Sequence, residues 1–496
     1  MVIGKENQNN LLPFVRVGAG ILGVFLLATI VSRLVYPFCN GTWESMNWMP
    51  AAHLLEGKNP YSYAFTPPYS MLPYGIFYYV LLAAGVASFG FQMWFGRILS
   101  IAAFAVCIWA IVKITKKLTD SKEAAWLACL AGLAMFPAQS WIGIMRPDLI
   151  AAAFGLVAMY LAFTLEEDKK TPVWRGVWMV LLSLAALFTK QTLLLPAGFI
   201  FLRFLQIKKW REAVWFISAF AVAAFSIMFL LNYTSSGGFF WQQFTNAEKL
   251  PYRIAQAALI FTVMLKQPTF LFSLVLLSVF GCLNRQFFKK FSPSELLKVL
   301  RSPKFLVFLY FAGSLIWAFL SAGREGGNTN YYIENSFSTA LVCALIYEYF
   351  KRNALPRRAL ATVILLLFGS VFQQIRVLRG EYFRWQALSY YREISDTVGK
   401  LTQPGSDCIS IYPELVVWNG CRFNFDDFEE YNGTWSPELI EIFGREIRSG
   451  RFAAIVWYDD TLQSKFPNYR LVPMSQKIPE KYFPAYLYVP ETRQTK

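Results

Sequence analysis

The sequence predicts an all-α polytopic membrane protein with about eleven transmembrane helices, followed by a small α/β soluble domain. Of the 496 residues, 56% are hydrophobic and 18% are aromatic, whereas only 16% are charged. Apolar runs long enough to cross a bilayer recur through the first three quarters of the chain. From about Gln373 the composition changes to that of a soluble domain.

The predicted spans are apolar segments of about 17 to 25 residues, the length that crosses the hydrocarbon core. The first lies within Leu11 to Phe38, contains Arg16 and Arg33, and lacks a small-residue cleavage site. We therefore expect a retained helix rather than a signal peptide. The expected spans are 13–37, 93–114, 123–140, 149–165, 173–189, 191–206, 211–231, 268–284, 304–322, 332–350 and 358–375.

The topology depends on the apolar stretch 70–90. The net charge of +16 comes from short basic clusters between the spans, which indicate cytoplasmic loops rather than a nucleic-acid-binding patch. If all these loops are cytoplasmic, an odd number of crossings separates Trp43 from Lys113. We therefore expect 70–90 to be a re-entrant or surface-lying hairpin, as Pro73 and the nearby tyrosines favour, with a true span as the alternative. The segment 251–265 is expected to be another surface-lying helix.

Two domains follow from this pattern: a transmembrane domain over residues 1–375, whose first outer loop (38–92) carries amphipathic helices, and an extracytoplasmic α/β domain over 376–496. The strands and the helix expected in the second domain are 408–412, 452–457 and 485–489, and 437–448. Because that compartment is oxidising, Cys408 and Cys421 could form a disulfide, although spacing alone leaves free thiols as the alternative.

Charged residues at the outer ends of the spans are the candidates for chemistry. Glu44 and Asp148 supply carboxylates, and the cations beside them are Arg146, Lys190, Arg253 and Arg324. Cations that neutralise a phosphate, next to a carboxylate that can take a proton, outline a transferase site. The alternative is that these side chains only snorkel or cap helices at the interface.

Metal chemistry has little support in the sequence. His53 is the single histidine, and the seven cysteines form no CxxC pair, so we assign no metal ligands. His53 is more often a packed residue than a ligand in such a setting. A base or ligand must therefore be a carboxylate, an amide or the backbone, and no cofactor is required, although a divalent cation remains possible.

Several short motifs occur in a characteristic order. Glu44 is followed by Gly57-Lys58-Asn59-Pro60-Tyr61 and by Pro67-Pro68. The later motifs are Gly96-Arg97, Arg146-Pro147-Asp148-Leu149, Lys190-Gln191-Thr192 and the segment from Gly326 to Glu334. Together they resemble the GT-C superfamily of membrane glycosyltransferases that use polyprenyl-phosphate sugars, which includes aminoarabinose and protein mannosyl transferases.

The resemblance implies roles for particular residues. Glu44 stands where the family has its first-loop catalytic acid, although many members have aspartate there, and Asp148 matches the second-loop acid. Arg146, Lys190, Arg324 and Arg253 would bind the donor phosphate. The sugar or acceptor pocket would be lined by Asn47, His53, Tyr61, Asn328, Asn330 and Glu334.

The implied activity is an inverting transfer of a hexose or pentose from a polyprenyl phosphate to a lipid, glycan or protein acceptor, with Glu44 as the general base. The protein would lie in the plasma (inner) membrane with its active site outside the cytoplasm. One alternative is a transporter or flippase of lipid-linked glycans, which would need charges nearer the bilayer midplane. Another is a non-catalytic subunit of a glycan-assembly complex.

Overall fold

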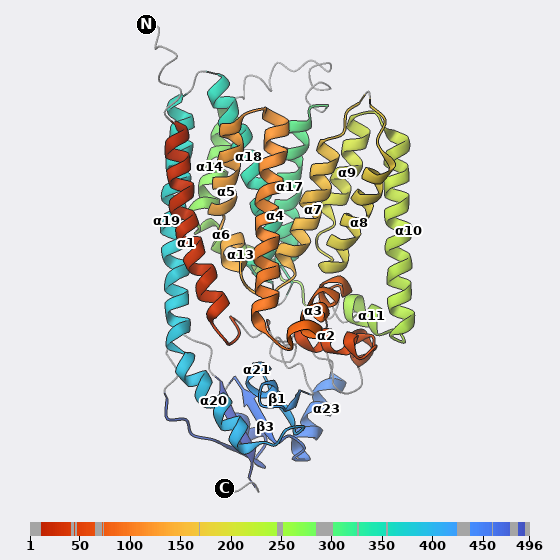
Figure 1. The fold of residues 1–496 in the computed structure, drawn as a ribbon, viewed down its shortest axis with the longest axis vertical. Helices are drawn as coiled ribbons and strands as arrows, with labels where there is room; N and C mark the ends of the chain where they lie inside the picture. The colour runs from red at the N-terminus through yellow and green to blue at the C-terminus, as the bar shows by residue number, and fades with distance from the viewer. Residues whose placement is uncertain are drawn as a thin grey trace.

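A bundle of long helices carries a small α/β lobe at one end in the computed structural model (Figure 1). The structure describes residues 11–40, 44, 47–64, 72, 74–167, 169–245, 251–283, 301–324, 327–353, 356–423, 437–458, 460–476 and 485–491. The bundle helices are α1 (Leu11–Val35), α4 (Met93–Thr119), α5 (Lys122–Ala134), α6 (Phe136–Trp141), α7 (Asp148–Phe163), α8 (Val173–Thr189), α9 (Leu195–Gln206), α10 (Trp210–Thr234), α14 (Pro268–Leu283), α17 (Pro303–Ala322), α18 (Ile333–Arg352) and α19 (Pro356–Gln386).

Each expected span coincides with a helix of the bundle, except that 123–140 is divided into α5 and α6. Met135, between them, has an extended backbone with φ −72° and ψ 125°. The break lies close to Pro137, whose ring would clash with a carbonyl one turn earlier if the helix continued. A break here frees α6 to turn toward the lobe end of the bundle.

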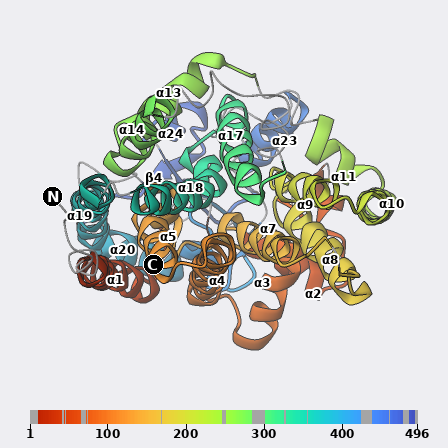
Figure 2. The ribbon, with the colours of Figure 1, turned by 90° about the horizontal axis from the view of Figure 1, so that it is seen from above.

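Length and composition identify four described helices that could each cross a membrane: α1 from Arg16, α4, α10 and α17. The segment 251–265, expected to lie at the surface, forms α13 (Ile254–Leu265), which meets α14 at 91°. That bent pair could form a fifth crossing. Viewed from above, α10 lies at one edge of the bundle and α1 and α19 lie at the other (Figure 2).

Short helices cover the end of the bundle that faces the lobe. They are α2 (Trp48–Leu55), η3 (Pro60–Ala64), α3 (Ile76–Phe89), α11 (Gly238–Phe240), η4 (Trp241–Thr245) and η5 (Thr329–Tyr332). The 14 residues of α3 extend only about 21 Å, less than the roughly 30 Å of a hydrocarbon core. Figure 1 places α3 beside α2, between the bundle and the lobe. Its position agrees with a surface-lying hairpin at 70–90.

The lobe contains a five-stranded sheet in the order β2-β1-β3-β5-β4. β1 pairs in parallel with β2 and β3, and β5 runs antiparallel to β3 and β4. Three strands and one helix were expected from the sequence, whereas β2 and β4 have only two and three residues, too few for a pattern. The elements are α20 (Leu388–Leu401), β1 (Asp407–Ser410), α21 (Glu414–Val417), β2 (Arg422–Phe423), α23 (Pro437–Arg448), β3 (Ala454–Trp457), α24 (Leu462–Lys465), β4 (Tyr469–Leu471) and β5 (Tyr486–Pro490).

A buried ion pair joins the first and last helices of the bundle. Arg33 Nε on α1 lies 2.8 Å from Glu381 Oε1 on α19, and both side chains are about 5% exposed or less. Arg33 also donates to the carbonyl oxygen of Ile142, and Arg384 pairs with Glu381. Because α19 continues to Gln386, the domain boundary expected at 375/376 falls inside this helix.

The disulfide considered between Cys408 and Cys421 is not formed, and both side chains are buried. Cys408 lies opposite Phe423 in the β1–β2 ladder, two residues beyond Cys421. Two residues along a strand and one strand spacing across give roughly 8 Å between the Cα atoms, more than a disulfide can bridge. Cys421 Sγ instead hydrogen-bonds Thr402 Oγ1 at 3.3 Å.

A close contact at Gly75 provides a test of how α3 packs against α8. A Cβ atom at Gly75, the N-cap of α3, would lie 2.1 Å from the carbonyl oxygen of Phe188 near the end of α8. Gly75→Ala is therefore expected to destabilise the protein by about 1–3 kcal/mol, as overpacking does. Thermal unfolding in detergent measures the change. Gly198→Ala on α9 is the control, because open space surrounds its Cβ position, and equal effects of the two variants would contradict this packing.

Candidate active site

A cluster of charged side chains surrounds Asp148, the first residue of α7. Arg146 Nε lies 3.1 Å from Asp148 Oδ2, Lys190 Nζ pairs with Oδ1, and Asn330 Nδ2 donates to Oδ1 at 2.8 Å. The side chain of Asp148 is only 2% exposed. Its position at a helix N-terminus also favours a negative charge. The fold thus brings together four residues that the sequence analysis singled out from three separate segments.

Aromatic rings hold the two cations in place. The Arg146 guanidinium carbon lies 4.7 Å from the ring centroid of Trp141 and 5.4 Å from that of Tyr74. Lys190 Nζ lies 4.7 Å from the ring centroid of Tyr331. Contacts of this kind stabilise a cation in a partly desolvated setting. Burial lowers the pKa of Lys190, and the charge of Asp148 offsets this only in part.

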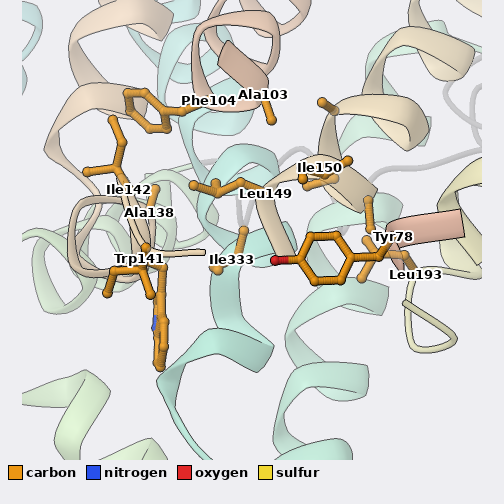
Figure 3. Close-up of a cluster of buried hydrophobic side chains, with 14 of the residues drawn as sticks. Tyr78, Ala103, Phe104, Ala138, Trp141, Ile142, Leu149, Ile150, Leu193 and Ile333 are labelled. Carbon is orange, nitrogen blue, oxygen red and sulfur yellow. The ribbon is translucent and has the colours of Figure 1, made fainter. Parts of the chain in front are cut away.

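The cluster borders a small pocket, which is called the cavity below. Tyr310 OH donates to Glu334 Oε1 at 2.8 Å on its α18 side. Apolar side chains, including Leu149, Leu193 and Ile333, pack around the base of the site (Figure 3). The cavity is lined by Asp148, Lys190, Thr192, Leu193, Trp317, Asn330, Tyr331, Ile333 and Glu334. Charged, polar and aromatic side chains thus meet at one pocket, a kind of lining that can orient a polar ligand.

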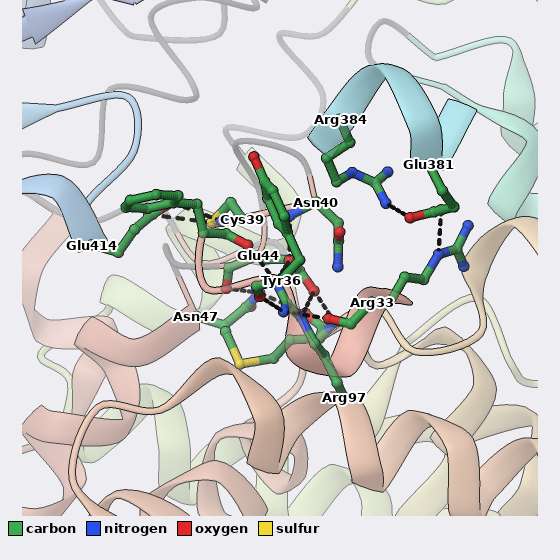
Figure 4. Close-up of polar contacts among 12 residues, drawn as sticks. Arg33, Tyr36, Cys39, Asn40, Glu44, Asn47, Arg97, Glu381, Arg384 and Glu414 are labelled. Atoms are coloured by element: carbon green, nitrogen blue, oxygen red, sulfur yellow. Dashed lines mark hydrogen bonds and ion pairs between the residues drawn. The ribbon is translucent and has the colours of Figure 1, made fainter. Parts of the chain in front are cut away.

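Glu44 is buried nearby, in an ion pair with Arg97 of α4 (Figure 4). Oε2 accepts from Arg97 Nη2 at 2.8 Å and from the backbone N–H of Asn40 at 2.6 Å. Oε1 accepts from Arg97 Nε at 3.3 Å and from the backbone N–H of Met145 at 2.6 Å. Burial raises the pKa of Glu44, but Arg97 and the two amides outweigh it, so that this pKa ends below its usual value.

These contacts connect Glu44 to the Asp148 cluster. Its bond to the Met145 amide holds the start of the segment 145–148, and Asn47 Nδ2 donates to the carbonyl oxygens of both Glu44 and Met145. Arg97 also donates to the carbonyl oxygen of Phe38, just beyond α1. Glu44 and Asp148 therefore lie at the same end of the bundle, as expected, but Glu44 does not line the cavity. The contacts give Glu44 a positioning role, and its role as a base stays a prediction.

The remaining pocket residues expected from the sequence make local contacts. His53 packs on the ring of Tyr63, with centroids 4.2 Å apart, and Tyr61 OH donates to the carbonyl oxygen of Tyr74 at 2.6 Å. Asn328 Oδ1 accepts from the backbone N–H of Thr329 and caps η5. None of these three expected pocket residues lines the cavity around Asp148. Their assignment to a sugar pocket stays a prediction.

Two of the expected phosphate-binding cations lie elsewhere. Arg253 and Arg324 are exposed, and neither is among the residues that line the cavity. They lie close to each other, because Arg253 N–H donates to the carbonyl oxygen of Gly323 and Tyr252 bridges to Arg324. Binding of the donor phosphate by these two arginines stays a prediction, and it would take place at the protein surface.

Arg97 and the aromatic residues around the cluster were not assigned from the sequence. Arg97 was expected only as part of the Gly96-Arg97 motif. A usable signal existed, since Arg97 is an ionisable residue near the start of a long apolar helix, and such residues need a buried partner. Tyr74, Trp141, Tyr310 and Trp317 could not be distinguished from the many other aromatic residues of a membrane protein.

A divalent cation has no recognisable site in the described part of the chain. Those residues contain no group of three or more histidine, cysteine, aspartate or glutamate side chains that could hold a metal. The carboxylate of Asp148 is already paired with Arg146 and Lys190.

Comparison with known proteins identifies the fold. The structure of ArnT from Cupriavidus metallidurans bound to undecaprenyl phosphate matches with a TM-score of 0.63, over 95% of this chain and 98% of that chain, at 11% identity. The chain has the fold of the GT-C superfamily. This agrees with the resemblance found in the sequence motifs, and residues 73–233 match the family model described as dolichyl-phosphate-mannose-protein mannosyltransferase.

A second GT-C structure is also similar. The archaeal oligosaccharyltransferase AglB from Archaeoglobus fulgidus, in complex with an inhibitory peptide and a dolichol-phosphate, matches with a TM-score of 0.51 at 10% identity. That match covers 88% of this chain and 69% of AglB. A search of curated protein sequences found no match. At these identities the structural likeness establishes the fold of this chain, and its chemistry must be argued from its own residues.

The single histidine provides a pH test of the first outer loop. Burial lowers the pKa of His53 from 6.5 to about 4, so that only the unfolded chain is protonated between these values. Stability is then fully present above about pH 6.5 and decreases as the pH falls toward 4. Thermal unfolding should show His53→Phe gaining about 2–3 kcal/mol relative to wild type between pH 7 and pH 4. A parallel pH dependence of the two proteins would contradict the burial of a neutral imidazole.

Proposed function

We propose that this GT-C protein transfers a sugar from a polyprenyl-phosphate donor to an acceptor bound beside Asp148. The observation that carries the proposal is the pairing of Arg146 and Lys190 with one carboxylate at the edge of an open cavity. Two desolvated cations can hold a phosphate, and a carboxylate beside them can take a proton. The structures with which this chain shares its fold contain undecaprenyl phosphate and dolichol-phosphate.

The arrangement suggests an exchange of partners on donor binding. In the free site Asp148 neutralises Lys190 and Arg146. The donor phosphate would compete for the same cations and release the Asp148 carboxylate toward the cavity. The cations would then stabilise the phosphate as a leaving group, so that no separate acid is needed.

The transfer we propose is a single displacement with inversion. The oxygen or nitrogen of the acceptor forms a bond to the anomeric carbon while the bond from that carbon to the phosphate oxygen breaks. The proton of the acceptor passes to a carboxylate. Asp148 reaches the cavity directly, whereas Glu44 would first have to release one of its four hydrogen-bond donors. Both remain candidates for the base, and the variants described below distinguish them.

The position of the site favours a transferase over a transporter or flippase. Asp148, Lys190 and Glu334 all lie at helix ends: the start of α7, the residue after α8 and the first turn of α18. A transporter would place its binding site near the bilayer midplane. We further propose eleven crossings, with α5 and α6 as one and α13 and α14 as another, and the lobe outside the cytoplasm of a plasma (inner) membrane.

Binding of undecaprenyl phosphate tests the phosphate site. Lys190→Met removes a charge-assisted contact, which should weaken binding by about 10- to 100-fold. Arg324→Met is the matched comparison, because that arginine is exposed and lies outside the cavity. Tryptophan fluorescence titration measures both affinities. A larger loss for Arg324→Met would place the phosphate at the Arg253–Arg324 surface instead of the Asp148 cluster.

Glu44→Gln separates the two roles of Glu44. The new amide group would face donors of Arg97 and the backbone, which leaves a buried donor unpaired at a cost of about 1–3 kcal/mol. If Glu44 positions the segment 145–148, both donor affinity and the rate of transfer of radiolabelled sugar should fall about tenfold or more. A pure base would change only the rate. Unchanged turnover would remove Glu44 from both roles, and the absence of any transfer by wild-type protein would contradict the proposed function.

A further inference from the structure

The lobe inserts a buried carboxylate into the first outer loop. Glu414, at the start of α21, is fully buried. Its Oε1 accepts a hydrogen bond from the backbone N–H of Cys39 at 2.8 Å, and its Oε2 accepts from Cys39 Sγ at 3.3 Å. Burying an ionised group is costly unless it is hydrogen-bonded, so this contact indicates a specific docked position of the lobe.

Aromatic contacts surround this junction. Trp418 Nε1 donates to the carbonyl oxygen of Phe91 at 3.2 Å. The ring of Trp418 lies 5.6 Å from that of Phe38 and 6.4 Å from that of Trp48, between centroids. Tyr391 of α20 also packs on Phe38 at 5.9 Å. The lobe therefore covers the turn after α1 with apolar surface and excludes water from the Glu414 contact.

Two carboxylates bind consecutive amides of this turn. Glu414 accepts a hydrogen bond from the backbone N–H of Cys39, and Glu44 accepts one from the next N–H, that of Asn40, at 2.6 Å. Glu44 in turn accepts from the amide of Met145, three residues before Asp148. Figure 4 shows Glu414, Cys39, Asn40 and Glu44 close together. A continuous series of short contacts therefore runs from the lobe to the candidate active site.

We propose that Glu414 is a positioning residue of the site, through which the C-terminal lobe sets the geometry of Arg146 and Asp148. Without its carboxylate the buried amide and thiol of Cys39 lose this charged acceptor, and the turn shifts in response. That shift moves the Asn40 amide away from Glu44. The Glu44 carboxylate then moves as well, and its hydrogen bond with the Met145 amide weakens. The inference rests on the proposed function for its consequence in turnover, although the coupling itself can be measured without any activity.

The test compares substitutions of two carboxylates of the lobe. Glu414→Ala removes the junction contact, and Glu414→Gln keeps one oxygen acceptor. Glu393→Ala is the matched control, because Glu393 accepts from the backbone N–H groups of Ser475 and Gln476 inside the lobe. We expect Glu414→Ala to lower kcat by about tenfold, Glu414→Gln to restore most of the loss, and Glu393→Ala to stay close to wild type. The double variant Glu414→Ala with Glu44→Gln should lose no more than Glu44→Gln alone.

Hydrogen–deuterium exchange of the purified full-length protein gives the second measurement. In Glu414→Ala, amides in 38–40 and in 143–146 should both exchange about tenfold faster, whereas the control should leave both unchanged. The inference is overturned if 38–40 is affected alone, if Glu393→Ala has the same effect, or if Glu414→Gln restores nothing. If wild-type protein transfers no sugar, the proposed function fails, and the exchange result still decides whether the lobe and the site are coupled.

Discussion

The ion pair between Glu44 and Arg97 is the interaction on which the site depends. Both side chains are fully buried, and Arg97 also donates to carbonyl oxygens at and beyond the end of α1. A single guanidinium thus links α1, α4 and the segment that follows α1, and its partner carboxylate extends the link to the segment before α7. Removing one partner of such a pair leaves an uncompensated charge, which typically costs about 3–5 kcal/mol.

A shared principle explains why the charged residues lie where they do. Buried charges are tolerated only when paired, and helix ends supply extra donors and acceptors. Arg33 with Glu381, Arg97 with Glu44, and Lys190 with Asp148 all lie at the end of the bundle near the lobe. Of these pairs, only the last reaches the open cavity. The first two are buried supports, and the third is available to a ligand.

Much of the fold could be predicted because apolar segments and helices have similar lengths. Every expected span corresponds to helical structure, and the GT-C resemblance is confirmed, whereas the break before Pro137 and the two shortest strands had no usable pattern. The clustering of Asp148, Arg146 and Lys190 could be anticipated, since their segments follow or precede spans on one side. Spacing could not reveal that Glu44 is saturated by four donors, or that Arg253 and Arg324 point to another surface, because both depend on tertiary contacts.

The continuity of α19 limits how the two parts of the molecule can move. This helix of 31 residues is about 46 Å long and passes from the bundle to the base of the lobe without interruption. Its last turns are fastened to α1 through Glu381. The lobe is therefore connected to the bundle by a continuous helix rather than by a flexible linker. Movement of the lobe away from the bundle would therefore require α19 to bend or the Arg33–Glu381 pair to break.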